Sequence, residues 1–232
     1  MARRGLEALE DWFEAGEAAE DGCLFPCLSF LVLRDCPKLK ELPSLPPMLY
    51  SLLMENTGWK TLNCCSISNS VPLTTLEVSA CPNITSLHLA DEIARLAALR
   101  SLTITKCPNL TSLGEMQTTN NCHLMLNHLS ISDPSVLLME PLRSFTSLKE
   151  LKISKNDELV SFPNQAEQWF LEDRPSLSLL AFGVPMLREL PNLPPSLGRL
   201  TVWYCHPDLK KRYGEDGGSD RNKIAHIPRI NI

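Results

Sequence analysis

One spacing recurs along the chain and constrains its fold more than any other feature. It consists of a leucine, an aliphatic residue three places on, another two places later, and a small residue three places after that. The clearest copies span residues 28–37, 73–82 and 99–108, and each ends in Cys-Pro. Looser copies begin at Leu49, Leu126, Leu148, Leu177 and Leu197. Successive copies start 20 to 29 residues apart, and such a constant segment with spacers of this length is typical of leucine-rich repeats.

The second and third aliphatic positions of each copy alternate with other residues, and this period of two predicts a short strand with one buried face. Stacked copies place these strands side by side in a parallel sheet. We therefore expect an α/β fold. It would be a leucine-rich repeat solenoid, curved as a right-handed superhelix, with the parallel β-sheet on the concave face and mixed loops and short helices outside. Sixteen side chains are predicted to be buried under the sheet: Leu31/Leu33, Leu52/Met54, Leu76/Val78, Leu102/Ile104, Leu129/Ile131, Leu151/Ile153, Leu180/Phe182 and Leu200/Val202.

The repeats divide the chain into three regions. Residues 28–205 hold about eight repeats, and these fold as one body because each can bury its apolar edge only against its neighbours. Residues 1–27 are acidic and contain no clean repeat, so we expect an N-terminal cap or a truncated upstream repeat. Residues 206–232 are expected to be a C-terminal cap or tail that lies against the last repeat, since an uncovered end exposes apolar surface.

The longer spacers between the repeats are predicted to hold short helical turns. Asp91 is a suitable cap for one such turn. Pro141 suits the first turn of a second. Asn164 is the predicted cap of a third, which carries Ala166, Trp169 and Phe170 on one side. The outside of the array is therefore expected to contain little helix.

Composition excludes several classes of function. The formal net charge of -5 gives no basic footprint for nucleic acid. No stretch approaches the ~20 apolar residues of a membrane helix, and the two arginines near the start lack the apolar run of a secretory signal. We therefore expect a cytoplasmic protein, or alternatively a nuclear one. Four of the nine cysteines share one repeat position and are expected to be reduced, inward-facing thiols: Cys36, Cys81, Cys107 and Cys205.

The repeat motif Leu-x-x-Leu-x-Leu followed by Cys-Pro-x-Leu-x-x-Leu resembles the C-terminal repeat domain of plant intracellular NLR immune receptors. Residues 205–212 and 223–228 are similar to the closing segment of coiled-coil NLRs from grasses. The resemblance covers roughly residues 24–232. It implies a module that senses pathogen effectors and holds an upstream nucleotide-binding domain inactive. Its partner would be a pathogen effector, a guarded host protein or the nucleotide-binding domain of the same receptor. The sequence has no Gly-x-x-x-x-Gly-Lys-Ser/Thr phosphate loop, so we expect either a fragment or a truncated relative.

In a solenoid, the residues that alternate with the buried leucines line the concave face. The aromatic, apolar and charged residues of this face lie mainly near the two ends of the array, because the middle is mainly Ser and Thr. Exposed Trp, Tyr and Arg dominate protein interfaces, so the last repeat is the favoured binding region. The candidate protein-binding residues are Phe30, Val32, Arg34, Leu53, Glu55, Lys152, Arg199, Trp203 and Tyr204.

Each group of candidates has an alternative interpretation. The apolar patch of Phe30, Val32 and Leu53 is equally consistent with a surface covered by a preceding segment. For Trp203, coverage by the tail after Asp208 is slightly favoured over an open binding surface, since terminal repeats need capping. Three lysines near the sixth repeat fit a solvated face better than a phosphate site: Lys149, Lys152 and Lys155.

Catalytic interpretations find little support in the sequence. The five histidines lack metal-type spacing with the cysteines, so neither a metal site nor a cofactor is expected. The chain is therefore expected not to be an enzyme, and a hydrolase or transferase ranks last. The alternative binding function is the substrate-recruiting arm of a ubiquitin ligase adaptor, which needs a multi-helix docking segment before the repeats.

Overall fold

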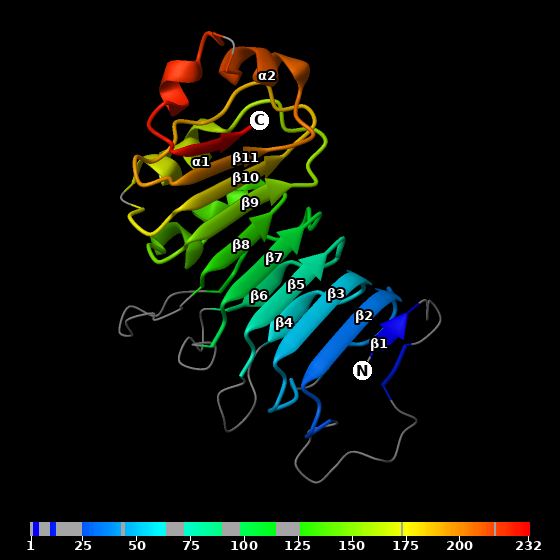
Figure 1. Cartoon of the computed structure of the whole chain (residues 1–232). Coiled ribbons are helices and arrows are strands. Elements are labelled where there is room, and N and C mark those ends of the chain that lie inside the picture. Colours follow the sequence, from blue (N-terminus) through cyan, green and yellow to red (C-terminus); the bar gives the residue numbers. More distant parts are fainter. Residues whose placement is uncertain are drawn as a thin grey trace. The chain divides into compact units, whose positions relative to one another are not determined.

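The computed structural model describes residues 2–4, 10–12, 25–42, 45–63, 72–89, 98–114, 126–172, 174–215 and 217–232. The chain divides into two units, Met1–Leu126 and Asn127–Ile232. Parallel strands dominate both units and helices are few, so the expected α/β class with a large parallel sheet is confirmed (Figure 1).

The first unit is built on parallel strands in register. In spatial order they are β1 (Ala2–Arg4), β2 (Phe30–Cys36), β3 (Ser51–Thr57), β5 (Thr75–Ser79) and β7 (Ser101–Thr105). A second, narrow parallel sheet is formed by β4 (Thr61–Asn63) and β6 (Ser86–His88). The repeat motif does not include these segments. Leu62 and Leu87 at their centres are in register, and both are buried.

The second unit repeats the arrangement with more helix. Its strands, in spatial order, are β8 (His128–Ile131), β9 (Glu150–Ser154), β10 (Leu179–Gly183), β11 (Arg199–Val202) and β12 (Arg229–Asn231), all parallel. Between them lie η1 (Pro134–Leu138), η2 (Leu142–Ser144), α1 (Asn164–Leu171), α2 (Pro207–Tyr213) and η3 (Arg221–Ile224).

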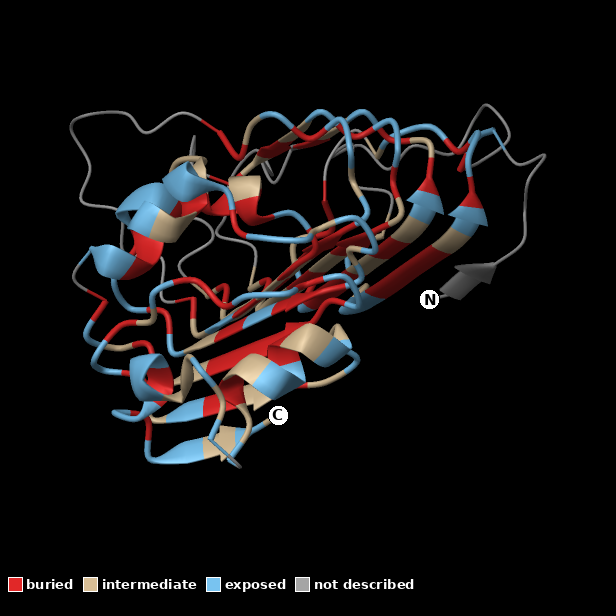
Figure 2. Ribbon diagram, turned by 90° about the horizontal axis from the view of Figure 1, so that it is seen from above, coloured by how far each residue is buried: buried red, intermediate tan, exposed pale blue. Residues whose placement is uncertain are grey.

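All sixteen side chains predicted for the buried side of the sheets are buried, most of them completely. Figure 2 shows the strands largely in the buried and intermediate classes, with exposed residues on the connecting loops. Burial of each aliphatic side chain contributes about 1.5–3 kcal/mol, so these rows supply most of the stability of each unit.

In several repeats one turn precedes the strand and another follows it, and proline occurs in both kinds of turn. Pro47 and Pro195 occupy the second position of turns closed by hydrogen bonds from Leu49 N to Pro46 O (3.0 Å) and from Leu197 N to Pro194 O (3.2 Å). These prolines lie one turn before the strand, where the fixed φ of proline suits the second turn position. After the strand, Pro82 takes the same position in the turn closed by Ile84 N and Cys81 O (3.4 Å).

A residue with positive φ stands directly before the small-residue position in most repeats. The six non-glycine residues of this kind are Asp35 (53°), Asn56 (50°), Ala80 (51°), Lys106 (54°), Lys155 (63°) and Tyr204 (49°). Two repeats depart from this pattern, at Asp133 and Val184, and in both a proline follows directly. A residue before proline is restricted to extended conformations, and Asp133 accordingly has φ -108° and ψ 118°.

The cysteines at the shared repeat position turn inward, as expected. Cys36 and Cys81 are buried, whereas Cys107 and Cys205 are half-buried, and the structure gives all four as free thiols. In the second repeat Thr57 takes this position, and its Oγ1 lies 3.3 Å from Cys81 Sγ.

Two of the three predicted helical turns lie in the described part of the chain. The turn expected after Asp91 lies outside the described residues. Pro141 precedes η2, as predicted. At α1, Asn164 is the first helical residue and Pro163 occupies the cap position, so the predicted capping role of Asn164 is wrong. The predicted apolar side of this helix is buried: Ala166, Trp169 and Phe170.

A buried arginine joins the helical segments of the second unit. Arg174 has 5% exposure, and its guanidinium donates hydrogen bonds to the carbonyls of Phe145 (2.8 Å), Arg143 (2.8 Å) and Trp169 (3.2 Å). It also lies 4.4 Å from the centroid of the Trp169 ring and pairs with Glu172. These contacts hold η2 against α1.

Both terminal regions pack onto their own units. Trp12 is buried beside Trp59 (6.2 Å between ring centroids), and its Nε1 donates to Lys40 O at 2.7 Å. At the other end, β12 pairs with β11, and α2 buries Leu209 and Tyr213. The tail therefore supplies an additional strand and a helix beside the last repeat.

Candidate functional site

The outward face of the first unit carries the first group of predicted binding residues. Phe30 of β2 is 49% exposed, and Leu53 of β3 is half-buried. Val32 is only 7% exposed, which corrects the prediction that it belongs to an open patch. It is in register with Ala2 of β1 and Leu53 of β3, so a strand flanks it on each side.

The structure adds two apolar residues to this group that the repeat pattern missed. Met48 is 59% exposed and Tyr50 is 56% exposed. Tyr50 N donates to Ser29 O at 2.7 Å, which places the tyrosine beside the strand that begins at Phe30. Both precede the strand of their repeat, so the alternation within the strand gives no signal for them.

A charged pair lies next to the apolar group. Arg34 and Glu55 are in register on β2 and β3, with Arg34 Nε and Glu55 Oε2 3.0 Å apart. The adjacent turn residues also contact each other, since Asn56 Nδ2 donates to Asp35 Oδ1 at 2.9 Å. The structure therefore brings the predicted pair together as an ion pair. At their exposure, about one third to one half, it contributes little to stability.

The second unit carries a flat aromatic platform on its outward face. A Cβ built on Gly183 of β10 would lie 2.5 Å from the ring of Trp203, so the indole lies directly on the glycine. Lys152 Nζ of β9 lies 5.2 Å from the centroid of the same ring, a cation–π geometry. Trp203 is half-buried, and Tyr204 beside it is 82% exposed.

Gly183 is the residue of this platform that sequence reasoning did not single out. The signal is its position, because Gly183 and Trp203 occupy equivalent places in consecutive repeats. Arg199, the last predicted residue of this group, is exposed at the start of β11. Lys152, Trp203 and Gly183 are thus in contact, whereas no contact of Arg199 with them is recorded among the described residues.

The thiols near these faces are poor nucleophiles. Burial raises the pKa of Cys107 to about 11, and burial also raises the pKa of Cys205. Both thiols are therefore protonated at neutral pH, whereas the reactive form of cysteine is the thiolate. Among the described residues, no three His, Cys, Asp or Glu side chains are grouped so as to hold a metal ion.

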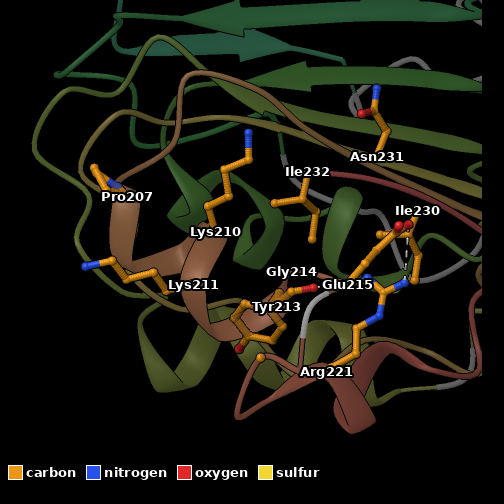
Figure 3. A pocket seen from close by; sticks show the side chains of 11 residues that line it. Pro207, Lys210, Lys211, Tyr213, Gly214, Glu215, Arg221, Ile230, Asn231 and Ile232 are labelled. Atoms are coloured by element: carbon orange, nitrogen blue, oxygen red, sulfur yellow. Dashed lines mark hydrogen bonds and ion pairs between the residues drawn. The ribbon is translucent and has the colours of Figure 1, made fainter.

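A cavity of about 710 Å³ lies between α2 and β12 in the second unit (Figure 3). Lys210, Lys211 and Arg221 are its basic residues, and Glu215 is its only carboxylate side chain among the described lining residues. Arg221 is held by Tyr213 O, to which its Nη1 donates at 3.0 Å. The charged side chains of the cavity are therefore mainly basic, and they lie beside apolar lining residues such as Ile230 and Ile232.

No family model matches the sequence, and no curated protein or solved structure matches it either. Within the part of the chain that the structure describes, no helix has the length and apolar character that a membrane span requires. Function must therefore be inferred from the surfaces described above.

Proposed function

We propose that this chain is a leucine-rich repeat solenoid that serves as the protein-recognition module of an intracellular plant immune receptor. Its role would be effector sensing, autoinhibition of a nucleotide-binding domain, or both, in a defence response. It would act in the cytoplasm or nucleus, by binding and not by catalysis, and without a cofactor.

Three features support the solenoid. Parallel strands succeed each other in register, each buried row is filled by the predicted aliphatic side chains, and the same left-handed turn residue follows most strands. A unit that recurs with this regularity buries its core only by stacking. The resemblance of the repeat and of residues 205–228 to grass NLRs supports the receptor context.

The observation that carries the binding function is the platform of Trp203, Lys152 and Gly183 with the exposed Tyr204. A large aromatic ring fixed on rigid strands offers contact area at low entropic cost, and Trp, Tyr and Arg are enriched at the energetic centres of interfaces. The thiols with raised pKa in these repeats agree with a binding role.

The test is co-expression of the chain in leaf tissue with the coiled-coil and nucleotide-binding segments of a grass NLR, scored by co-precipitation and cell death. We expect the chain to co-precipitate with these segments and to suppress their autoactivity. The variant Trp203→Ala/Tyr204→Ala should weaken both effects. Leu171→Ala, which truncates an exposed apolar residue on α1, is the matched control and should change neither. If the chain binds neither these segments nor an effector, the proposal fails.

A further inference from the structure

Two pairs of side chains that face each other across neighbouring strands join a basic residue to an acidic one. Arg34 faces Glu55 in register, with 3.0 Å between the charged atoms. His128 faces Glu150 in register, with 2.8 Å between Nδ1 and Oε2. Such pairs stabilise a sheet, and like charges directly opposite one another destabilise it.

The last two strands of the second unit instead place two basic residues opposite each other. Arg199 of β11 is in register with Arg229 of β12, and both side chains are exposed. Among the described residues, neither guanidinium has a carboxylate within ion-pair distance, whereas nearby Arg212 pairs with both Glu189 and Asp220. The two arginines thus form a cationic pair with no counter-ion in the part of the chain that the structure describes.

This pair borders a cleft of about 490 Å³ that could accommodate the missing acid. Thr201, Arg221 and Asn231 contribute further polar groups to its lining. Its carboxylate side chain among the described residues, Glu215, lies 4.0 Å from Arg221 and leaves Arg199 and Arg229 unpaired. Figure 3 shows Glu215, Arg221 and Asn231 where this cleft adjoins the larger cavity under α2.

We propose that this cleft binds an acidic peptide segment of a protein partner, with a carboxylate side chain placed between Arg199 and Arg229. The planar guanidinium group matches the geometry of a carboxylate and pairs with it in a bidentate manner. The net charge of -5 disfavours a long polyanion such as a nucleic acid, so a short acidic segment is the better fit. This inference rests on the proposed recognition function and names the chemistry of the partner.

The test uses the full chain and a fluorescein-labelled octaglutamate peptide, with binding followed by fluorescence anisotropy at low ionic strength. We expect Arg199→Gln/Arg229→Gln to raise the dissociation constant at least tenfold. Lys155→Gln, which changes an exposed lysine of the same unit, is the charge-matched control for the single variant Arg229→Gln and should change the dissociation constant less than twofold. An octaglutamine peptide should bind at least tenfold more weakly than octaglutamate.

Folding of the variants is checked by thermal unfolding. Because removal of one arginine relieves repulsion, Arg229→Gln should melt at or above the temperature of the wild type. A tenfold loss of peptide binding in this folded variant supports the inference.

Three results would overturn it. The first is an equal loss of affinity in Lys155→Gln, which would show diffuse attraction only. The second is tighter binding of a single-stranded oligonucleotide with eight phosphates. The third is absence of octaglutamate binding to the wild type, which leaves the co-precipitation test of the recognition function unaffected.

Discussion

A residue in the left-handed conformation lies near the end of the strand in most repeats of this protein. An L-residue in this region costs roughly 1–2 kcal/mol, yet Asp, Asn, Ala, Lys and Tyr all adopt it at the same place in the repeat. The position is therefore imposed by the packing of the repeat and not chosen by the side chain. Where proline follows directly, at Asp133 and Val184, the chain leaves the strand by a different route, and at Asp133 it enters η1.

Ala80→Gly is expected to stabilise the first unit. Glycine adopts φ 51° without the steric cost, which outweighs its greater entropy in the unfolded chain, so the free energy of unfolding should rise by about 0.5–1 kcal/mol. Urea denaturation measures the change. Ala181→Gly deletes the same methyl group inside β10 and should lower the free energy of unfolding by about 0.5–1 kcal/mol. Destabilisation by both substitutions would contradict the left-handed conformation at Ala80.

At the level of secondary-structure elements, the contact between Gly183 and Trp203 shows how a residue of one strand allows a side chain of the next repeat to pack on it. Only a residue without a side chain lets the indole lie on β10, since a Cβ would lie 2.5 Å from the ring. The position of the ring then allows Lys152 of β9 to approach its face. Strands β9 and β10 and the residue that follows β11 thus contribute one residue each to the platform.

Gly183→Ala should therefore lower stability by about 1–3 kcal/mol, because the added methyl group overpacks the ring. In the Trp203→Ala background the same substitution should be neutral or stabilising, since alanine suits a strand better than glycine. Urea denaturation of the four proteins gives the coupling energy between the two sites. Equal effects of Gly183→Ala in both backgrounds would show that the ring does not lie on the glycine.

For the whole molecule, the four described cysteines of the repeats report on the packing of both units. Cys36 and Cys81 are buried, Cys107 has a pKa raised to about 11 by burial, and Cys27 is exposed outside the repeats. Reactivity toward N-ethylmaleimide requires an accessible thiolate, so it follows both exposure and pKa.

Of the five described cysteines, we expect N-ethylmaleimide to modify Cys27 first in the native protein at pH 7.5, with Cys36 and Cys81 protected until the chain is unfolded in urea. Modification of Cys107 should accelerate as the pH rises toward 11, because the thiolate fraction grows up to its pKa. Peptide mapping by mass spectrometry measures each site. Rapid labelling of Cys36 and Cys81 under native conditions would contradict the buried position of the repeat cysteine.

The sequence predicts the strands of the repeats well because their information is local. Leu102 and Ile104 alternate with polar residues, and this alone identifies both the strand and its buried face. The pairing of Arg34 with Glu55 is also predictable, since the parallel strands of neighbouring repeats align equivalent positions of the motif.

Features that depend on several repeats at once were not predicted. The strand at Leu62 forms because a second one at Leu87 lies beside it, and a single copy of the motif does not show this. Helix α2 is a different case, because it has local signals that lie outside the repeat motif. His206 Nδ1 accepts a hydrogen bond from Asp208 N at 3.2 Å, and Pro207 occupies the first turn. The burial of Val32 depends on pairing of β2 with β1, whose short segment has no repeat pattern.

The short strand β12 has a consequence for solubility. A free strand edge is a template for association with another chain, and proteins guard such edges with brevity and charge. β12 is three residues long and begins with Arg229, beside a second arginine on β11. Two copies that paired through the edge of β12 would bring their arginine side chains close together, and these would repel each other. The two arginines that we propose to bind an acidic peptide therefore also oppose self-aggregation through this strand edge.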